Sequence, residues 1–223
     1  MDIAAFLQEI CAMPGHSGME SAVACRVAEE FSKYSGDVCI DKLGNVRAVM
    51  GDHGPTVLVC AHMDEVGMIV TGIEDNGFLR IWQMGGIDPR ILPGSEVTVF
   101  GREKLYGVIG AKPIHLLTSE EREKSVPVKD LYIDIGALSR QEAEEAVFPG
   151  DPVTFDSLFD TAHGMIKSRA LDDRAGCAIL IDLLKKPLLY DMLFAFVVQE
   201  ETGLNGSKTA AYIADPDAAI VVE

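Results

Sequence analysis

Three short and almost entirely apolar runs constrain the fold of this 223-residue chain more than any other feature. They span residues 56–61, 192–198 and 218–222. Runs of this length without polar alternation are typical of strands that are covered on both faces, as in the sheet of an α/β protein. Acidic or histidine side chains follow each run within three residues. Because open α/β sheets bind ligands at the carboxyl ends of their strands, we expect these polar groups to converge on one crevice.

Helical spacing of apolar residues surrounds the three runs. It predicts helices over residues 2–12, 19–34, 173–184 and 205–213. A hairpin is predicted from strands at 38–40 and 46–49, and a Gly54–Pro55 break precedes the first apolar run. The pattern indicates an α/β fold with a mixed sheet flanked by helices.

The composition changes between residues 65 and 160. Short alternating runs there are separated by turn pairs such as Asn76-Gly77, Gly85-Gly86 and Pro93-Gly94, which is typical of a small antiparallel barrel or sandwich. We therefore expect an α/β domain built from residues 1–64 and 161–223, interrupted by a β-rich, barrel-like insert over 65–160. Within this insert, the charged segment 118–129 is predicted to be an exposed loop or lid.

Charge and cysteine content exclude several classes of protein. The chain has 35 acidic and 19 basic residues, a net charge of −16, which argues against a nucleic-acid or anionic-membrane partner and favours cations or positively charged ligand groups. No apolar run is long enough to span a membrane, and no signal peptide is evident, so we expect a cytoplasmic location. The five cysteines lack any Cys-x-x-Cys pair, which argues against a disulfide framework or a thiolate zinc site.

Two adjacent acids, Asp172 and Asp173, lie at the start of a predicted helix. A carboxylate has two oxygens, so Asp172 could give one to each of two metal ions, while Asp173 and Arg174 hold its orientation. The alternative is a helix N-cap, in which one of these acids accepts hydrogen bonds from the first turn.

The other candidate ligands follow the apolar runs. His62 with carboxylates but without thiolates suits zinc, cobalt or manganese better than a structural zinc site. Asp64 would face the same side of an extended chain and hold the other imidazole nitrogen. Of Glu200 and Glu201, one could bind metal while its neighbour, aimed elsewhere, acts as a general base; the alternative is a pair of solvated charges. Glu223 is a further candidate ligand at the end of the third run.

Four motifs together resemble one enzyme family. They are Ala61-His62-Met63-Asp64-Glu65-Val66-Gly67, Leu171-Asp172-Asp173-Arg174-Ala175-Gly176, Gln199-Glu200-Glu201-Thr202-Gly203 and Val221-Val222-Glu223. Their order and spacing resemble the dinuclear metallo-aminopeptidases that include the glutamyl, deblocking and tetrahedral (TET) aminopeptidases, sometimes labelled cellulase or endoglucanase. The resemblance runs through the whole chain, and it implies an α/β peptidase domain with a β-rich insert.

The resemblance implies a site for two divalent metal ions, zinc or cobalt. By position, Asp172 would bridge both ions, His62 and Glu223 would complete one site, and Glu201 would belong to the other. A cis peptide after Asp172 is also implied by the family.

The implied activity is that of an aminopeptidase acting on short peptides. Glu200 would be the general base for a water activated by the two metals, and Asp64 would orient His62. Relatives assemble through the insert, so a homo-oligomer is implied, from a dimer up to a tetrahedral dodecamer.

The chain departs from the family pattern in two respects. Glu223 stands where the family commonly has Asp, and no histidine follows His163 to supply the further metal ligand that the family has. We therefore expect a C-terminally truncated chain with weakened binding of the second metal and little activity.

Two other functions stay open. One is a glycoside hydrolase that uses Glu200 and Glu201 as its acid pair, although side chains of neighbouring residues in a strand point to opposite faces. The other is a non-catalytic assembly module. Loss of activity on chelation, and its return with metal, would indicate the peptidase.

Overall fold

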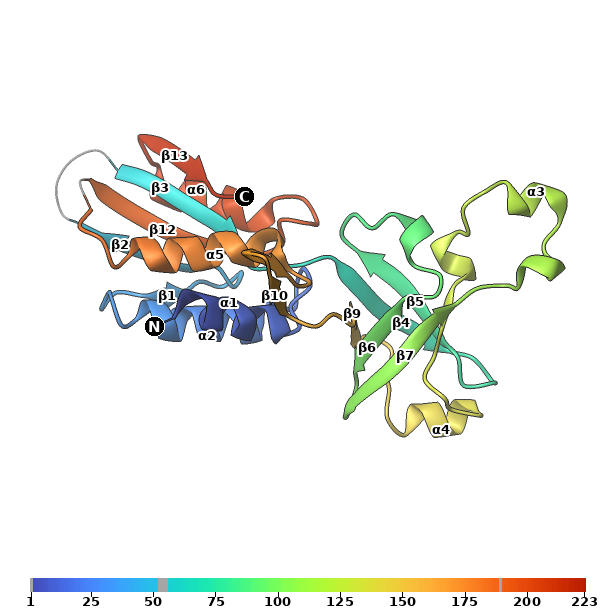
Figure 1. Cartoon of the computed structure of the whole chain (residues 1–223). Coiled ribbons are helices and arrows are strands. Elements are labelled where there is room, and N and C mark those ends of the chain that lie inside the picture. The colour runs from blue at the N-terminus through green and yellow to red at the C-terminus, as the bar shows by residue number, and fades with distance from the viewer. Residues whose placement is uncertain (1, 52–55, 189) are drawn as a thin grey trace. The chain divides into compact units, whose positions relative to one another are not determined.

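A computed structural model describes residues 2–51, 56–188 and 190–223 of the chain. The chain divides into two compact units (Figure 1). Unit 1 comprises Met1–Glu65 and Leu158–Glu223, and unit 2 comprises Val66–Ser157. The sequence-based division at residues 65 and 160 lies close to these bounds. The predicted Gly54–Pro55 break lies outside the described residues.

Unit 1 contains a mixed five-stranded sheet. In spatial order its strands are β1 (Cys39–Ile40), β2 (Val46–Met50), β12 (Asp191–Val197), β3 (Thr56–His62) and β13 (Ala218–Val221). The strand β3 pairs in parallel with both β12 and β13, whereas β2 is antiparallel to β12 and β1. In this register Val197 lies opposite His62, so β3 and β12 end at the same edge of the sheet. The prediction of an α/β fold with a mixed sheet is confirmed.

Four helices cover this sheet. They are α1 (Ile3–Ala12), α2 (Ser21–Phe31), α5 (Leu171–Leu183) and α6 (Asn205–Ala214). Alternate residues of β3 face opposite ways: Val59 and Ala61 pack in the core formed with α1, α2 and α5, and Leu58 and Cys60 pack in a smaller core that includes Ala210 of α6. Burial on both faces explains why the central strands are apolar without alternation. A short exposed hairpin, β10 (Asp160–Ala162) and β11 (Met165–Lys167), precedes α5.

Unit 2 is a closed antiparallel barrel of six strands. In order around the barrel these are β4 (Gly67–Ile73), β5 (Leu79–Met84), β8 (Tyr132–Asp134), β7 (Lys104–Gly110), β6 (Glu96–Phe100) and β9 (Pro152–Phe155). The connections contain η1 (Pro89–Ile91), η2 (Ile114–Leu116), α3 (Ser119–Arg122), η3 (Val128–Asp130) and α4 (Arg140–Glu144). The predicted β-rich insert is thus a barrel, and closure removes the open edges of its sheet.

The charged segment 118–129 is exposed except at Val126 and Val128, which pack against the core of the barrel. It also contains a short helix, α3, which the sequence did not predict. The Thr118 hydroxyl accepts the backbone N–H of Glu121, and the Glu121 carboxylate accepts the N–H of Thr118, so a reciprocal capping box starts this helical turn. No helix among the described residues has the length and apolar composition needed to cross a bilayer.

Candidate metal centre

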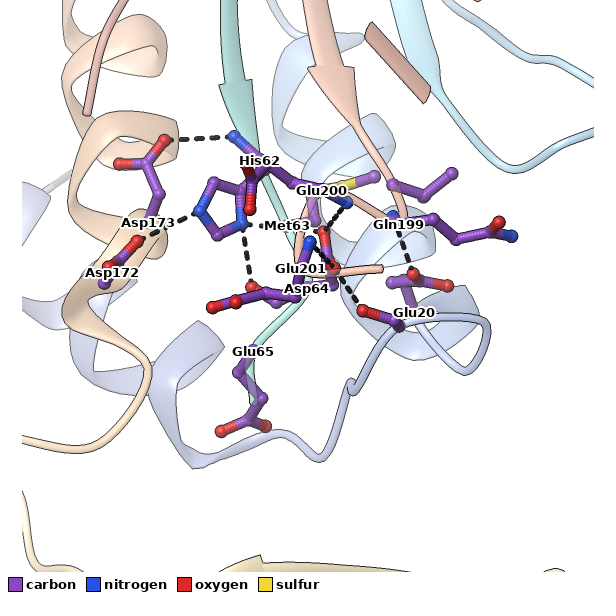
Figure 2. Close-up of polar contacts among 12 residues, drawn as sticks. Glu20, His62, Met63, Asp64, Glu65, Asp172, Asp173, Gln199, Glu200 and Glu201 are labelled. Carbon is purple, nitrogen blue, oxygen red and sulfur yellow. Dashed lines mark hydrogen bonds and ion pairs between the residues drawn. The ribbon is translucent and has the colours of Figure 1, made fainter. Parts of the chain in front are cut away.

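The end of β3 places His62 in the interior of unit 1. The residue is 4% exposed, and its Nδ1 lies 3.0 Å from the backbone carbonyl oxygen of Asp64 and 3.5 Å from Oδ1 of the same residue. Its Nε2 points the other way and lies 3.0 Å from Oδ1 of Asp172 (Figure 2). An imidazole held through one nitrogen, with the other directed at a carboxylate, has the arrangement of a metal-ligating histidine.

The two acids at the start of α5 have different surroundings. Asp173 is buried, and its carboxylate accepts the backbone N–H of His62 at 3.0 Å and that of Gly176 at 2.9 Å. It therefore fixes the start of α5 against the end of β3 and takes the capping role that the sequence left open between the two acids. The side chain of Asp172 is 74% exposed and contacts only the imidazole of His62 among the contacts described. The peptide bond between Asp172 and Asp173 is cis.

The segment after β12 carries Glu200 and Glu201. The carboxylate of Asp64 accepts both of their backbone N–H groups, through Oδ1 from Glu200 at 3.0 Å and through Oδ2 from Glu201 at 3.1 Å. The hydroxyl of Ser17 donates a third hydrogen bond to Asp64, at 2.5 Å. Asp64 thus contacts the imidazole at the end of β3 and also anchors the acidic segment beside it.

The directions of the two glutamates differ from the sequence-based expectation. Glu200 and Glu201 were expected to point to opposite faces, as neighbours in a strand do. However, β12 ends at Val197, and the chain then turns through Gln199, whose φ is 55°. In this turn both glutamates offer a carboxylate oxygen close to His62. The adjacency of Glu200 and Glu201 in the sequence therefore does not determine how far apart their carboxylates lie.

Five candidate ligands form two overlapping groups. One atom each of His62, Asp172 and Glu223 lies within 4.8 Å of the others, and the same holds for His62, Glu200 and Glu201. Imidazole and carboxylate donors at this spacing fit zinc, cobalt or manganese. The proposed pairing of Asp172 with Glu201 around a second ion is not among these groups.

The pKa values in this cluster reflect crowded negative charge. Burial lowers the pKa of His62, but the hydrogen bond with Asp64 and the charges of Asp64 and Asp173 outweigh it and raise the pKa from 6.5 to about 9. Burial raises the pKa of Asp173 to about 6. Burial and repulsion between neighbouring carboxylates also raise the pKa of Glu200 and Glu201, against the opposing charge of His62. A bound cation would relieve this repulsion.

A buried ion triad joins the segments around the cluster. The carboxylate of Glu65 accepts hydrogen bonds from both Arg169 and Arg174, and the latter side chain is completely buried. Arg174 also donates to the carbonyl oxygen of Met63 at 3.2 Å and to that of Met13 at 2.6 Å. Arg174 was expected to support Asp172, and the structure shows that it ties the start of α5 to the end of β3 and to the loop after α1.

Sequence reasoning did not identify several polar residues that surround the candidate ligands. They are Ser17, Glu20, Asn45, Glu65 and Arg169. Glu65 lies within one of the four motifs but was given no role, and the other four residues lie outside these motifs. Ser17, Glu20, Asn45 and Glu65 are distinguished by their burial, and Arg169 by its ion pair with Glu65. Neither feature is visible in a sequence.

Known proteins match most of this chain. The family model described as M42 glutamyl aminopeptidase matches residues 44–223. The lysyl aminopeptidase of Pyrococcus furiosus is 32% identical over 97% of this chain and 65% of its own length. The chain spans 58–66% of the length of the first curated relatives that it matches.

Solved structures resemble the whole chain. A TET aminopeptidase from a marine sediment archaeon of the Thaumarchaeota has a TM-score of 0.94 at 34% identity, covering 100% of this chain and 66% of that one. The TET1 peptidase of Pyrococcus horikoshii, described as assembling into a tetrahedron or a large octahedral shell, has a TM-score of 0.83 at 39% identity, covering 100% and 68%. A Thermotoga maritima protein labelled endoglucanase has a TM-score of 0.81 at 38% identity, covering 97% and 65%. The chain belongs to the M42 glutamyl aminopeptidase family.

Proposed function

We propose that the protein is a metal-dependent aminopeptidase that removes N-terminal residues from short peptides. The observation that carries the proposal is the convergence of one imidazole and four carboxylates from three strand ends and the start of α5. Membership of the M42 family supports the same activity. Relatives named as aminopeptidases support the class of substrate.

The residues of the cluster would hold two divalent ions, zinc or cobalt. His62, Asp172 and Glu223 would hold one ion, and Asp172 and Glu201 would hold the other. When bound, such ions polarise a scissile carbonyl and lower the pKa of water. These four donors fit that role because none is a thiolate and three are anionic.

Glu200 is the general base in this proposal. Its carboxylate would take a proton from the attacking water and return it to the nitrogen of the leaving amine as the peptide C–N bond breaks. Asp64 holds Glu200 for this step through the backbone N–H and orients His62 through Nδ1. The surplus of carboxylates would also attract the free ammonium group of a peptide N-terminus.

We further propose a homo-oligomer, from a dimer up to a tetrahedral dodecamer. The support is that similar TET peptidases are described as a dodecamer or as tetrahedral and octahedral shells. Sedimentation velocity on the purified protein tests this, and a monomer at micromolar concentration contradicts it.

A glycoside hydrolase is the second candidate, because one similar structure is labelled endoglucanase. In that class two carboxyl groups flank one glycosidic bond. Glu200 and Glu201 instead both lie beside the imidazole of His62, which favours a metal centre with an adjacent base.

One experiment separates these functions. Aminoacyl chromogenic amides, their N-acetylated counterparts and a chromogenic cellobioside are incubated with the protein before and after treatment with a chelator, and again after zinc or cobalt is restored. We expect cleavage only of amides with a free amine, loss of cleavage on chelation and recovery with metal. Cleavage of the cellobioside, or cleavage of amides that survives chelation, contradicts the proposal.

A further inference from the structure

We propose that Glu20 is a positioning residue for the segment that carries Glu200 and Glu201, acting through the backbone of Gln199. This inference rests on the proposed function, because it assigns a task to Glu20 in presenting the general base. Glu20 contacts neither the proposed ligands nor the reacting atoms in the contacts described.

The backbone from Val198 to Glu201 is held in an unusual way. Its four successive N–H groups all donate to side-chain oxygens and not to backbone carbonyls: Val198 to Asn45 Oδ1 at 3.0 Å, Gln199 to Glu20 Oε1 at 3.1 Å, and the two glutamates to Asp64. Most backbone N–H groups in proteins bond to backbone oxygens. Three separate parts of the chain therefore fix this short segment.

The conformation of the segment explains why such support is needed. Gln199 has a φ of 55°, a left-handed conformation that is unfavourable for a residue other than glycine. A residue in this region persists only when its surroundings determine its conformation. The hydrogen bond from Glu20 acts directly on the residue where the chain turns, one position before the proposed base.

Glu20 itself is fixed for this task. It is 4% exposed, and its Oε1 accepts the backbone N–H of Gln199 (Figure 2). The same oxygen also accepts the backbone N–H of Gly18 at 2.7 Å. A buried carboxylate is costly unless its hydrogen bonds are made. Here it joins the loop before α2 to the turn after β12, two segments that lie 179 residues apart.

Asn45 supports the neighbouring residue by the same means. It is completely buried, and its amide nitrogen donates to the carbonyl oxygen of Gly206 at 3.2 Å and to the hydroxyl of Thr209 at 3.0 Å. Asn45 therefore fixes α6 as well as Val198, whereas Glu20 bonds to the turn and to its own loop. Glu20 is for this reason the residue at which positioning of the acidic segment can be tested with the least change elsewhere.

The test compares Glu20→Ala, Glu20→Gln and Glu20→Asp with the wild type. Gln keeps an oxygen that can accept both N–H groups, Ala removes it, and Asp keeps the charge but shortens the reach by one methylene. The matched control is Glu29→Ala, on the exposed side of α2. The readouts are kcat and KM on an aminoacyl amide, the visible absorption spectrum of the cobalt-loaded protein, and hydrogen exchange of the amides at 198–201 in the metal-free protein.

We expect Glu20→Ala and Glu20→Asp to lower kcat about 10- to 100-fold with little change in KM, since a displacement of about 1 Å costs that much. Both variants should alter the absorption spectrum of the cobalt-loaded protein and increase the rate of hydrogen exchange at the amide of Gln199. Glu20→Gln should recover most of the loss in all three readouts, and Glu29→Ala should match the wild type. If Glu20→Ala does not fold, the comparison of Asp with Gln decides.

Two results overturn the inference. One is wild-type exchange and kcat in Glu20→Asp and Glu20→Ala, and the other is a Gln variant as impaired as the Asp variant. These differ from failure of the proposed function, in which the wild type itself neither binds cobalt nor cleaves the amide. In that case there is no general base for Glu20 to position. The hydrogen-exchange data then show only whether Glu20 holds the turn.

Discussion

The two units of the chain bury different kinds of side chain. Among the described residues, the buried polar and charged side chains of unit 1 are His16, Ser17, Glu20, Glu30, Asn45, His62, Asp64, Glu65, Asp173 and Arg174, whereas those of unit 2 are Thr98 and Thr154. Buried charge lowers stability unless it is paired and hydrogen-bonded. The barrel of unit 2 is therefore stabilised by an almost wholly apolar core, whereas unit 1 also needs buried hydrogen bonds and ion pairs to hold its charged side chains in place.

The largest effect expected from this contrast concerns the proposed base. Glu200→Gln should lower kcat about 10²- to 10⁴-fold, because the amide cannot accept a proton from water. Its bound metal should stay close to the wild-type amount. The matched control is Glu96→Gln, at an exposed position of β6 in unit 2, which should leave kcat unchanged. Equal activity of Glu200→Gln and wild type would remove Glu200 from the mechanism.

The buried triad predicts the largest change in stability. Glu65→Ala leaves the guanidinium of Arg174 buried without its carboxylate partner, so the free energy of unfolding should fall by about 3–5 kcal/mol. Urea denaturation measures this change. Glu103→Ala, at an exposed position in unit 2, is the control. Its free energy of unfolding should stay within about 0.5 kcal/mol of the wild-type value. A loss for Glu65→Ala no larger than that of its control would show that the triad is not needed for the fold.

The buried carboxylate of Glu30 in unit 1 also predicts a change in stability. Burial raises the pKa of Glu30, but hydrogen bonds from Lys33 at 2.7 Å and Arg26 at 3.2 Å outweigh it and lower the pKa below 4.5. A lowered pKa stabilises the fold above the unfolded value, and this contribution is lost as the pH falls through the folded value. Glu30→Gln should therefore be less stable than wild type by about 1–3 kcal/mol at neutral pH.

The pH dependence provides the check on Glu30. The difference between wild type and Glu30→Gln should shrink as the pH falls below 4.5, because wild-type Glu30 then becomes protonated. Urea unfolding at several pH values measures it. A difference that is the same at all pH values would show that packing, not charge, accounts for the effect.

The smallest effect is expected in the barrel. Thr98 and Thr154 lie opposite each other in the register of β6 and β9. Replacing both by Val exchanges two buried hydroxyl groups for methyl groups of similar volume. The free energy of unfolding should therefore change by no more than about 1 kcal/mol. Metal binding should be unaffected. A larger loss would show that unit 2 also depends on buried polar groups.

The same contrast explains what the sequence could predict. The apolar runs predicted the strands because burial on both faces leaves a clear pattern, and the turn pairs of 65–160 predicted a β-rich insert. His62, Glu200, Glu201 and Glu223 became candidates because they follow these runs closely, and Asp172 because two adjacent acids precede a predicted helix. Their positions in the sequence could be read without knowing how distant segments pack.

The supporting residues could not be read in this way. Glu20 and Asn45 bond to residues 179 and 153 positions away, and each resembles an ordinary surface or turn residue in its local sequence. The directions of Glu200 and Glu201 were also misjudged, because they depend on the turn at Gln199 and not on the strand before it. Local patterns predict elements, whereas contacts between distant loops depend on the assembled fold.

Metal content decides whether the cluster around His62 is a metal centre. Wild type and Asp172→Ala are dialysed against buffer containing zinc or cobalt, then against metal-free buffer, and analysed for metal per chain. If His62 and the four carboxylates form a metal centre, the wild type should retain divalent metal and the variant should retain clearly less. If the wild type retains none, or the variant retains as much, the cluster is not a metal centre and the proposed mechanism is wrong.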